Sequence, residues 1–254
     1  MILVVAGMFV LGLGALARRG WSPAVRALAA WADVRPVLWV YIRAAPATFS
    51  YLAILTVTTW VLMGSSDRLV DLLLREHSTN LHQLSIDPVR VLVRSAFWVP
   101  GYGFLAWALL FTVVLAPAER WLGTRRCVAV FATGHVLASL GTVVILSIAI
   151  RYRWAPSGLA DSVDVGVSYG FAAVAAIFTF RLPSRWRRGW VTALVGLAVA
   201  ALLVSRTFTD VGHLLALGVG FASYPLTTKA SVRSRLTDRL LFSARRFPLG
   251  RRQH

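Results

Sequence analysis

Three polar side chains stand inside long apolar stretches of this sequence, where an ionisable or hydroxyl group is costly to place. Ser168 lies in Gly166-Val167-Ser168-Tyr169-Gly170, His213 follows Asp210-Val211-Gly212, and His135 lies near the middle of another stretch. A serine hydroxyl becomes a nucleophile when an adjacent base takes its proton. Ser168 and His213 are therefore candidates for a nucleophile and its general base.

Small residues flank both candidates. Gly166 and Gly170 are four residues apart, and Gly212, Ala216 and Gly220 repeat the same spacing. Such stripes let two membrane helices approach closely. Two simpler interpretations stay open. The Ser168 hydroxyl could bond to the backbone of its own helical turn. The His213 ring could be paired with the backbone or with Asp210.

The elements that must position these residues are membrane-spanning helices. Hydrophobic residues make up 57% of the 254 positions and charged residues 15%, which is too apolar for a soluble domain of this size. A span needs roughly 20 apolar residues. We expect an all-α membrane protein with six core spans, at about 47–64, 96–117, 127–150, 163–180, 190–205 and 208–227. A further apolar run, 2–17, precedes Arg18-Arg19 and is interpreted as an extra span, a cleaved signal or a mis-assigned start.

The distribution of basic residues predicts the orientation of the spans. The segments 18–43, 118–126, 181–189 and 229–254 hold twenty of the 27 basic residues, and the alternate connections hold seven. Basic loops stay in the cytoplasm. The six-span core should therefore lie in a bacterial plasma membrane with both of its ends on the cytoplasmic side. Residues 1–46 then form an apolar segment and basic linker, 47–227 the membrane domain, and 228–254 a basic cytoplasmic tail. That tail is either an interfacial helix on anionic lipid or a solvated segment.

The longest outer connection, 65–95, contains the amphipathic stretch Asp67 to Glu76 and then a polar turn, Ser78-Thr79-Asn80. We expect the stretch to form a helix at the outer leaflet. Asp164 and Asp210, each near the start of a span, are expected to cap their helices.

Several classes of function find no support in the sequence. The basic residues lie in short stretches between apolar runs, so membrane topology explains the net charge of +17 better than nucleic-acid binding does. Cys127 is the single cysteine, so neither an intrachain disulfide nor a cysteine zinc cluster is expected. No phosphate loop or dinucleotide fingerprint is present. We expect no metal and no cofactor.

The motifs and their order resemble the rhomboid family of intramembrane serine proteases. That family has six spans, a long outer loop after the first, a Gly-x-Ser motif at the fourth and a His-x-x-small-x-x-x-Gly motif in the sixth. Gly166-x-Ser168 and His213 with Ala216 and Gly220 match, as does Glu119-Arg120-Trp121-Leu122-Gly123 after the second span. The resemblance implies a six-helix rhomboid-like bundle in a divergent bacterial branch, in which Ser168 attacks a peptide bond of a transmembrane substrate and His213 accepts the proton.

The chain also departs from the family pattern. The His-x-x-x-Asn pair that stabilises the oxyanion on the second span is absent from the corresponding region, 97–107, and Tyr169 replaces the glycine after the serine. Backbone amides near Ser168, Tyr102 or His135 are the candidate substitutes. His135 is equally interpreted as a buried, hydrogen-bonded residue.

The departures leave two alternatives to a protease. One is an inactive pseudoprotease that binds membrane helices. The other is a small transporter or proton relay built on His135, His213, Asp164 and Asp210, for which no internal repeat or paired broken helices are evident.

Overall fold

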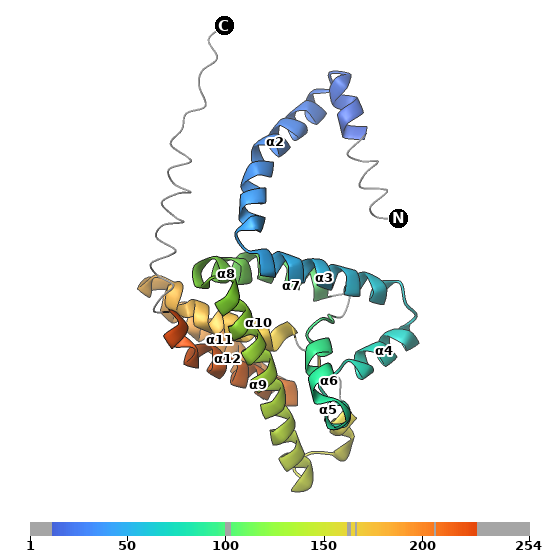
Figure 1. The fold of residues 1–254 in the computed structure, drawn as a ribbon, viewed down its shortest axis with the longest axis vertical. Coiled ribbons are helices and arrows are strands. Elements are labelled where there is room, and N and C mark those ends of the chain that lie inside the picture. Colours follow the sequence, from blue (N-terminus) through green and yellow to red (C-terminus); the bar gives the residue numbers. More distant parts are fainter. Residues whose placement is uncertain (1–11, 100–102, 162–163, 166, 206, 228–254) are drawn as a thin grey trace. The chain divides into compact units, whose positions relative to one another are not determined.

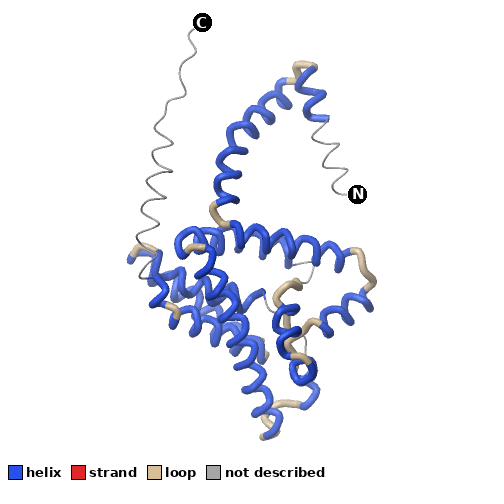
Figure 2. Tube along the Cα trace, in the orientation of Figure 1, coloured by secondary structure: helices blue, strands red, loops and turns tan. Residues whose placement is uncertain are grey.

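The computed structural model describes residues 12–99, 103–161, 164–165, 167–205 and 207–227, and these residues contain helices and connections but no strand (Figures 1 and 2). The chain divides into two units, Met1–Pro46 and Ala47–His254. In the first, α2 (Ser22–Arg43) exposes apolar side chains such as Trp31 and Val37, and the Arg43 guanidinium lies 4.8 Å from the centre of the Trp39 ring. Most of the apolar run 2–17 and all of the tail 228–254 lie outside the described residues.

The second unit contains the predicted spans. Among the described residues, four helical segments are long and apolar enough to cross a membrane: α3 (Pro46–Met63), Phe104–Leu122, α9 (Thr124–Arg151) and α11 (Ser184–Val204). Two shorter apolar segments complete the set of six, Val167–Arg181 and α12 (Phe208–Ala222). The first of these two comprises α10 (Val167–Phe178) and a 3₁₀ turn, Thr179–Arg181. The predicted all-α membrane bundle is confirmed.

The second span begins later than the sequence prediction placed it. A separate helix, α6 (Pro88–Ser95), precedes it, and the Arg90 amide of this helix donates to the Asp87 carboxylate. The prediction of a start at residue 96 was wrong, because residues 96–99 form a turn and an irregular stretch after α6. The span itself is α7 (Phe104–Leu110), a π-helical turn (Phe111–Leu115) and α8 (Ala116–Leu122). Pro117 lacks the amide that would continue the α-helical ladder, which is a usual cause of such a turn.

The connection 65–95, which the sequence predicts to be the outer connection, consists of three short helices. The amphipathic stretch predicted as a helix is α4 (Asp67–Glu76), whose exposed Arg75 and Asp71 side chains pair at 3.0 Å. The turn Ser78-Thr79-Asn80 follows, and the Asn80 side chain accepts a hydrogen bond from the Gln83 amide at the start of α5 (Leu81–Ile86). A 3₁₀ turn, Ser157–Asp161, lies between α9 and α10, and another, Tyr224–Thr227, follows α12.

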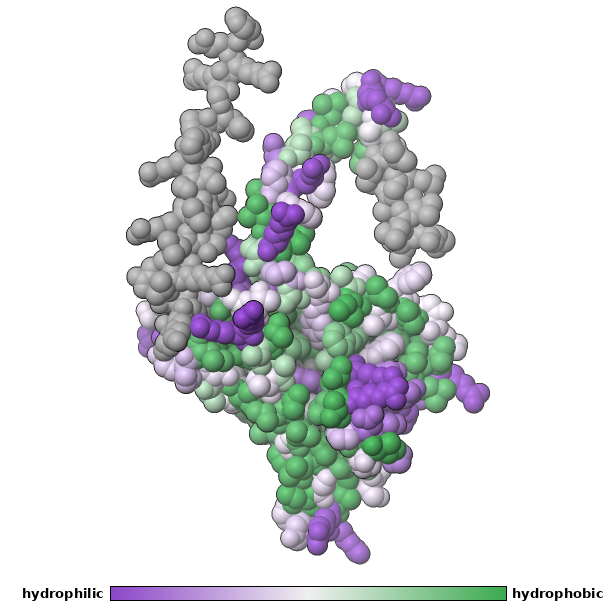
Figure 3. Space-filling model, viewed as in Figure 1, coloured by the Kyte–Doolittle hydropathy of each residue, from purple (hydrophilic) through white to green (hydrophobic). Residues whose placement is uncertain are grey.

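The interior of the bundle is built by α9, α10 and α12, which contact one another directly. Ala173 of α10 lies between two glycines: a Cβ atom added at Gly134 of α9 would overlap its side chain, and one at Gly220 of α12 would overlap its carbonyl oxygen. By contrast α11 has no buried residue, and apolar side chains cover the exposed surface of α9 (Figure 3). A surface of this kind suits a hydrocarbon environment.

A buried carboxylate fixes the beginning of the first span. Glu119 accepts hydrogen bonds from the Ala47 and Thr48 amides, the Thr48 hydroxyl and the Thr124 hydroxyl, at 2.7–3.0 Å. These amides belong to the first turn of α3, which lacks intrahelical acceptors and carries the positive end of the helix dipole. Gly123 then joins α8 to α9 with φ +85°, a conformation that L side chains rarely adopt. The Glu119-to-Gly123 motif therefore has a structural explanation.

The contact at Ala173 predicts opposite effects for two glycine substitutions in α12. Gly220→Ala should destabilise the bundle by about 1–3 kcal/mol, because the new methyl group overlaps the Ala173 backbone. Gly218→Ala adds its methyl group to open space and should be neutral or stabilising by up to about 1 kcal/mol, since alanine favours a helix. Thermal unfolding of the two variants in the same detergent measures the difference. Equal midpoints would show that α10 and α12 are not in close contact.

Candidate functional site

The predicted nucleophile and base are carried by two helices that pack in parallel. Tyr169 of α10 fills the space that a side chain at Gly212 of α12 would need, and one to two turns further along, Ala173 and Ala176 meet Gly220. The contacts advance in the same direction on both helices. Ser168 and His213 each neighbour a member of the Tyr169–Gly212 contact, so they lie at matching depth in the bundle.

We call this line of contacts between α10 and α12 the seam. Ser168 and His213 both lie at the seam, but they are not hydrogen-bonded to each other. Both side chains are partly buried, and no hydrogen bond between the Ser168 hydroxyl and the His213 ring occurs in the structure. The His213 ring instead meets the edge of the Tyr169 ring, with centroids 5.1 Å apart and an interplanar angle of 71°. The two side chains must therefore move into hydrogen-bonding distance before the imidazole can accept a proton directly from Ser168.

Tyr169, at the position where the family pattern has a glycine, was expected with Gly166 as a possible oxyanion or supporting residue, and the structure gives its side chain a packing and hydrogen-bonding role that the sequence did not indicate. Its side chain is fully buried, in a cluster with Ala138 and Ala216. Its hydroxyl donates to the Asp164 carboxylate at 3.0 Å and lies 3.4 Å from the Thr209 carbonyl oxygen. Tyr169 thus links the segment before α10 to the first turn of α12.

The same aspartate holds the outer connection against the bundle. The Thr79 hydroxyl donates to the Asp164 carboxylate at 3.1 Å, the Thr79 amide donates to the Asp164 carbonyl oxygen at 2.9 Å, and the Asp164 amide donates to the Ser78 hydroxyl at 2.6 Å. The expected helix-capping role for Asp164 was wrong, because the carboxylate of this residue is used by Thr79 and Tyr169. The turn Ser78–Thr79 is 85 residues away in sequence, and nothing in the local pattern indicates this pairing.

Burial raises the pKa of the Asp164 carboxyl to about 6, although the hydrogen bonds from Tyr169 and Thr79 act in the opposite direction. The group lies in the connection that precedes α10. Because its pKa in the folded protein is above the ordinary value of 3.8, folding favours the protonated form. The contribution of Asp164 to stability is therefore largest at low pH and declines as the pH rises through 6.

Asp210 behaves as the sequence predicted. Its carboxylate accepts from the Thr207 amide and the Thr207 hydroxyl at 2.9 and 2.6 Å, and these contacts form a capping box at the start of α12. The cap fixes the first turn of the helix that carries His213 one turn later.

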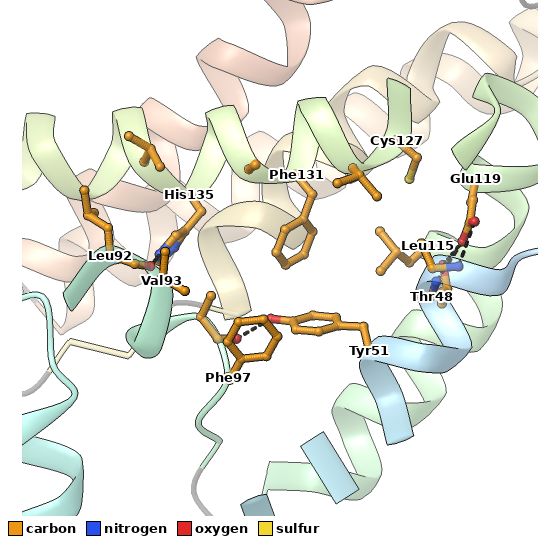
Figure 4. Close-up of a pocket in the computed structure, with 15 residues that line it drawn as sticks. Thr48, Tyr51, Leu92, Val93, Phe97, Leu115, Glu119, Cys127, Phe131 and His135 are labelled. Atoms are coloured by element: carbon orange, nitrogen blue, oxygen red, sulfur yellow. Dashed lines mark hydrogen bonds between the residues drawn. The ribbon is translucent and has the colours of Figure 1, made fainter. Parts of the chain in front are cut away.

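The remaining candidates occupy different places. His135 is buried on α9 and its Nε2 lies 2.8 Å from the Leu92 carbonyl oxygen and 3.2 Å from the Ser95 hydroxyl, both of α6 (Figure 4). Gly170 faces Phe131 of α9, whereas the spacing suggested that it faces the sixth span. Gly166 and Tyr102 lie outside the described residues. Among the residues that the structure describes, no group of three or more metal-binding side chains occurs.

Comparison with known proteins assigns the chain to a protein family. No curated protein and no solved structure matches it. The model of the family described as "rhomboid-like protein" matches residues 40–233, which include every span from α3 to α12. The chain therefore belongs to the rhomboid-like protein family.

Proposed function

We propose that the protein is an intramembrane serine protease that hydrolyses peptide bonds of transmembrane substrates with a dyad of Ser168 and His213. The observation that carries this proposal is the parallel packing of α10 and α12 at Tyr169 and Gly212, because it brings a hydroxyl and an imidazole to one depth on adjoining helices. The Ser168 side chain is partly exposed and forms no hydrogen bond to another described residue, so its hydroxyl is free to receive a base.

In the proposed reaction the His213 ring turns from Tyr169 towards Ser168. The Ser168 oxygen then attacks the carbonyl carbon of the scissile bond while the imidazole takes the hydroxyl proton. The imidazolium gives that proton to the leaving amine as the C–N bond breaks. Water, deprotonated by the same imidazole, attacks the acyl carbon, and the imidazolium returns the proton to the Ser168 oxygen as the ester C–O bond breaks. Free backbone amides in the first turn of α10 are the candidate donors to the oxyanion, since the His135 Nε2 is engaged with α6.

One observation favours a second function, the capture of membrane helices without cleavage. The span Phe104–Leu122 contains no histidine or asparagine, and an oxyanion donor contributes on the order of 10²–10³ in turnover elsewhere. In addition, the Tyr169 ring fills the space at Gly212 and packs against the His213 ring. On this alternative, Ser168→Ala leaves the capture of partner helices unchanged.

Labelling with a fluorophosphonate separates the two functions. Wild-type protein in detergent should become covalently labelled, and Ser168→Ala should lose the label. His213→Ala should slow labelling by about a thousandfold or more, as the loss of a base does in serine hydrolases. Ser147→Ala is the matched control, because that hydroxyl bonds only to its own helix at Val143, and it should label like wild type. Folded wild-type protein that takes no label would support helix capture instead.

We also propose that the protein lies in the bacterial plasma membrane with its C-terminus in the cytoplasm, because the connections at 118–126, 181–189 and 229–254 are the basic ones. Gly158 and Ser184 are exposed residues on opposite sides in this topology.

Two cysteine variants test this orientation in a Cys127→Ala background. A membrane-impermeant maleimide applied to intact cells should label Gly158→Cys. It should label Ser184→Cys only after the membrane is permeabilised, since the bilayer separates that residue from the reagent. The reverse pattern would invert the topology, and labelling of both residues in intact cells would contradict the assignment of spans.

A further inference from the structure

A cavity of about 320 Å3 lies between α3, α6, α8 and α9, and neither Ser168 nor His213 lines it (Figure 4). Apolar side chains line it, including those of Tyr51, Leu92, Phe97, Phe131 and Val136. Because the surrounding medium of these spans is hydrocarbon, an open apolar cavity here is in contact with lipid rather than water.

The polar groups at the two ends of the cavity are already satisfied by the protein. At one end the Glu119 carboxylate accepts from Thr48 and Thr124, and at the other the His135 Nε2 is bonded to α6 (Figure 4). A ligand would therefore meet hydrocarbon along almost the whole wall, so the occupant must be apolar over the length of the cavity.

The length of the cavity decides which apolar occupant it matches. Its wall on α9 runs from Cys127 to Val136, which is roughly 14 Å at the rise of an α-helix. This is close to the depth of one leaflet, about 15 Å of hydrocarbon. A transmembrane helix must continue across about 30 Å of hydrocarbon, roughly twice the length of this wall, so the cavity does not match a transmembrane helix. A single acyl chain has the required thickness and length.

One end of this wall carries a positive charge. Arg125 precedes Val128, Ala132 and Val136 by three, seven and eleven residues, a spacing that places all four on one face of α9. The Arg125 side chain is exposed and forms no hydrogen bond or ion pair with another described residue. An arginine at a helix end extends to the membrane interface, where lipid phosphates lie.

We propose that this groove is a binding site for one anionic phospholipid, with an acyl chain between α3, α6 and α9 and the headgroup phosphate at Arg125. Such a lipid would fill the space beside α3, which is held to the bundle by the Glu119 cap and by the packing of Tyr51 on Phe111 and Phe131. Bound lipid would thereby stabilise the position of the first span.

A photoreactive lipid tests the site. The protein is reconstituted in vesicles that contain phosphatidylglycerol with a diazirine on its acyl chain, irradiated, and mapped by mass spectrometry. Adducts should concentrate on the α9 segment 128–136 and saturate with probe concentration. Ala132→Trp places a large side chain in the groove and should lower these adducts several-fold. Ala129→Trp is the control, because Ala129 is exposed on the same helix but does not line the cavity, and it should behave as wild type.

The headgroup is tested separately. Arg125→Gln should reduce the preference for phosphatidylglycerol over a phosphatidylcholine probe with the same chain by about fivefold, the contribution of one arginine near an anionic surface. If Ala132→Trp does not fold, alkylation of Cys127, which lines the cavity, supplies the readout: phosphatidylglycerol should slow it in wild-type protein. Adducts that rise without saturation and are equal in the two tryptophan variants would show annular lipid only and overturn the proposal.

Discussion

The arrangement of the whole bundle depends on how closely three helices approach at Ala173. Its side chain occupies the space that a Cβ atom at Gly134 would need, and its carbonyl oxygen does the same at Gly220. In hydrocarbon there is no hydrophobic force between helices, so van der Waals packing of this kind must hold them together. Because α10 is buried between α9 and α12, its position determines the depth at which Ser168 is presented. The catalytic proposal therefore rests on a packing contact before it rests on any hydrogen bond.

At the Tyr169–Gly212 end of the seam, hydrogen bonds rather than further glycine contacts stabilise the packing of α10 and α12. Tyr169 fills the space that Gly212 leaves, and its hydroxyl reaches Asp164, which in turn holds Thr79 of the outer connection. Oδ2 of the buried Asp164 carboxylate accepts both of these hydrogen bonds, and the first of them satisfies the buried tyrosine hydroxyl, which needs a partner away from water. This single network connects the outer loop, the start of α10 and the start of α12. It also places the Tyr169 ring against the His213 ring. Whether the protein cleaves helices or only binds them therefore depends on the orientation of the His213 ring.

Much of the architecture could be predicted from the sequence because hydrocarbon imposes strong constraints on composition. Apolar length located the spans, and the amphipathic pattern of α4 and the capping box at Asp210 agreed with the structure. The start of the second span was missed, since the apolar residues 96–99 that follow α6 continue the apolar run of the span in sequence without belonging to its helix. The pairing of Asp164 with Thr79 and the orientation of Gly170 towards Phe131 could not be predicted, because both depend on three-dimensional contacts between distant segments. The family resemblance carried the assignment of Ser168 and His213 further than their spacing did.

The most direct test of the central claim measures whether Ser168 and His213 adjoin. In a Cys127→Ala background, Ser168→Cys and His213→Cys are combined and treated with the shortest bifunctional methanethiosulfonate. The account predicts that intact mass shows one spacer bridging both residues. The control pair, Ser168→Cys with Gly218→Cys on an exposed part of α12, should instead acquire two separate adducts. If the first pair also acquires two separate adducts in folded protein, the hydroxyl and the imidazole do not share a site, and the account is contradicted.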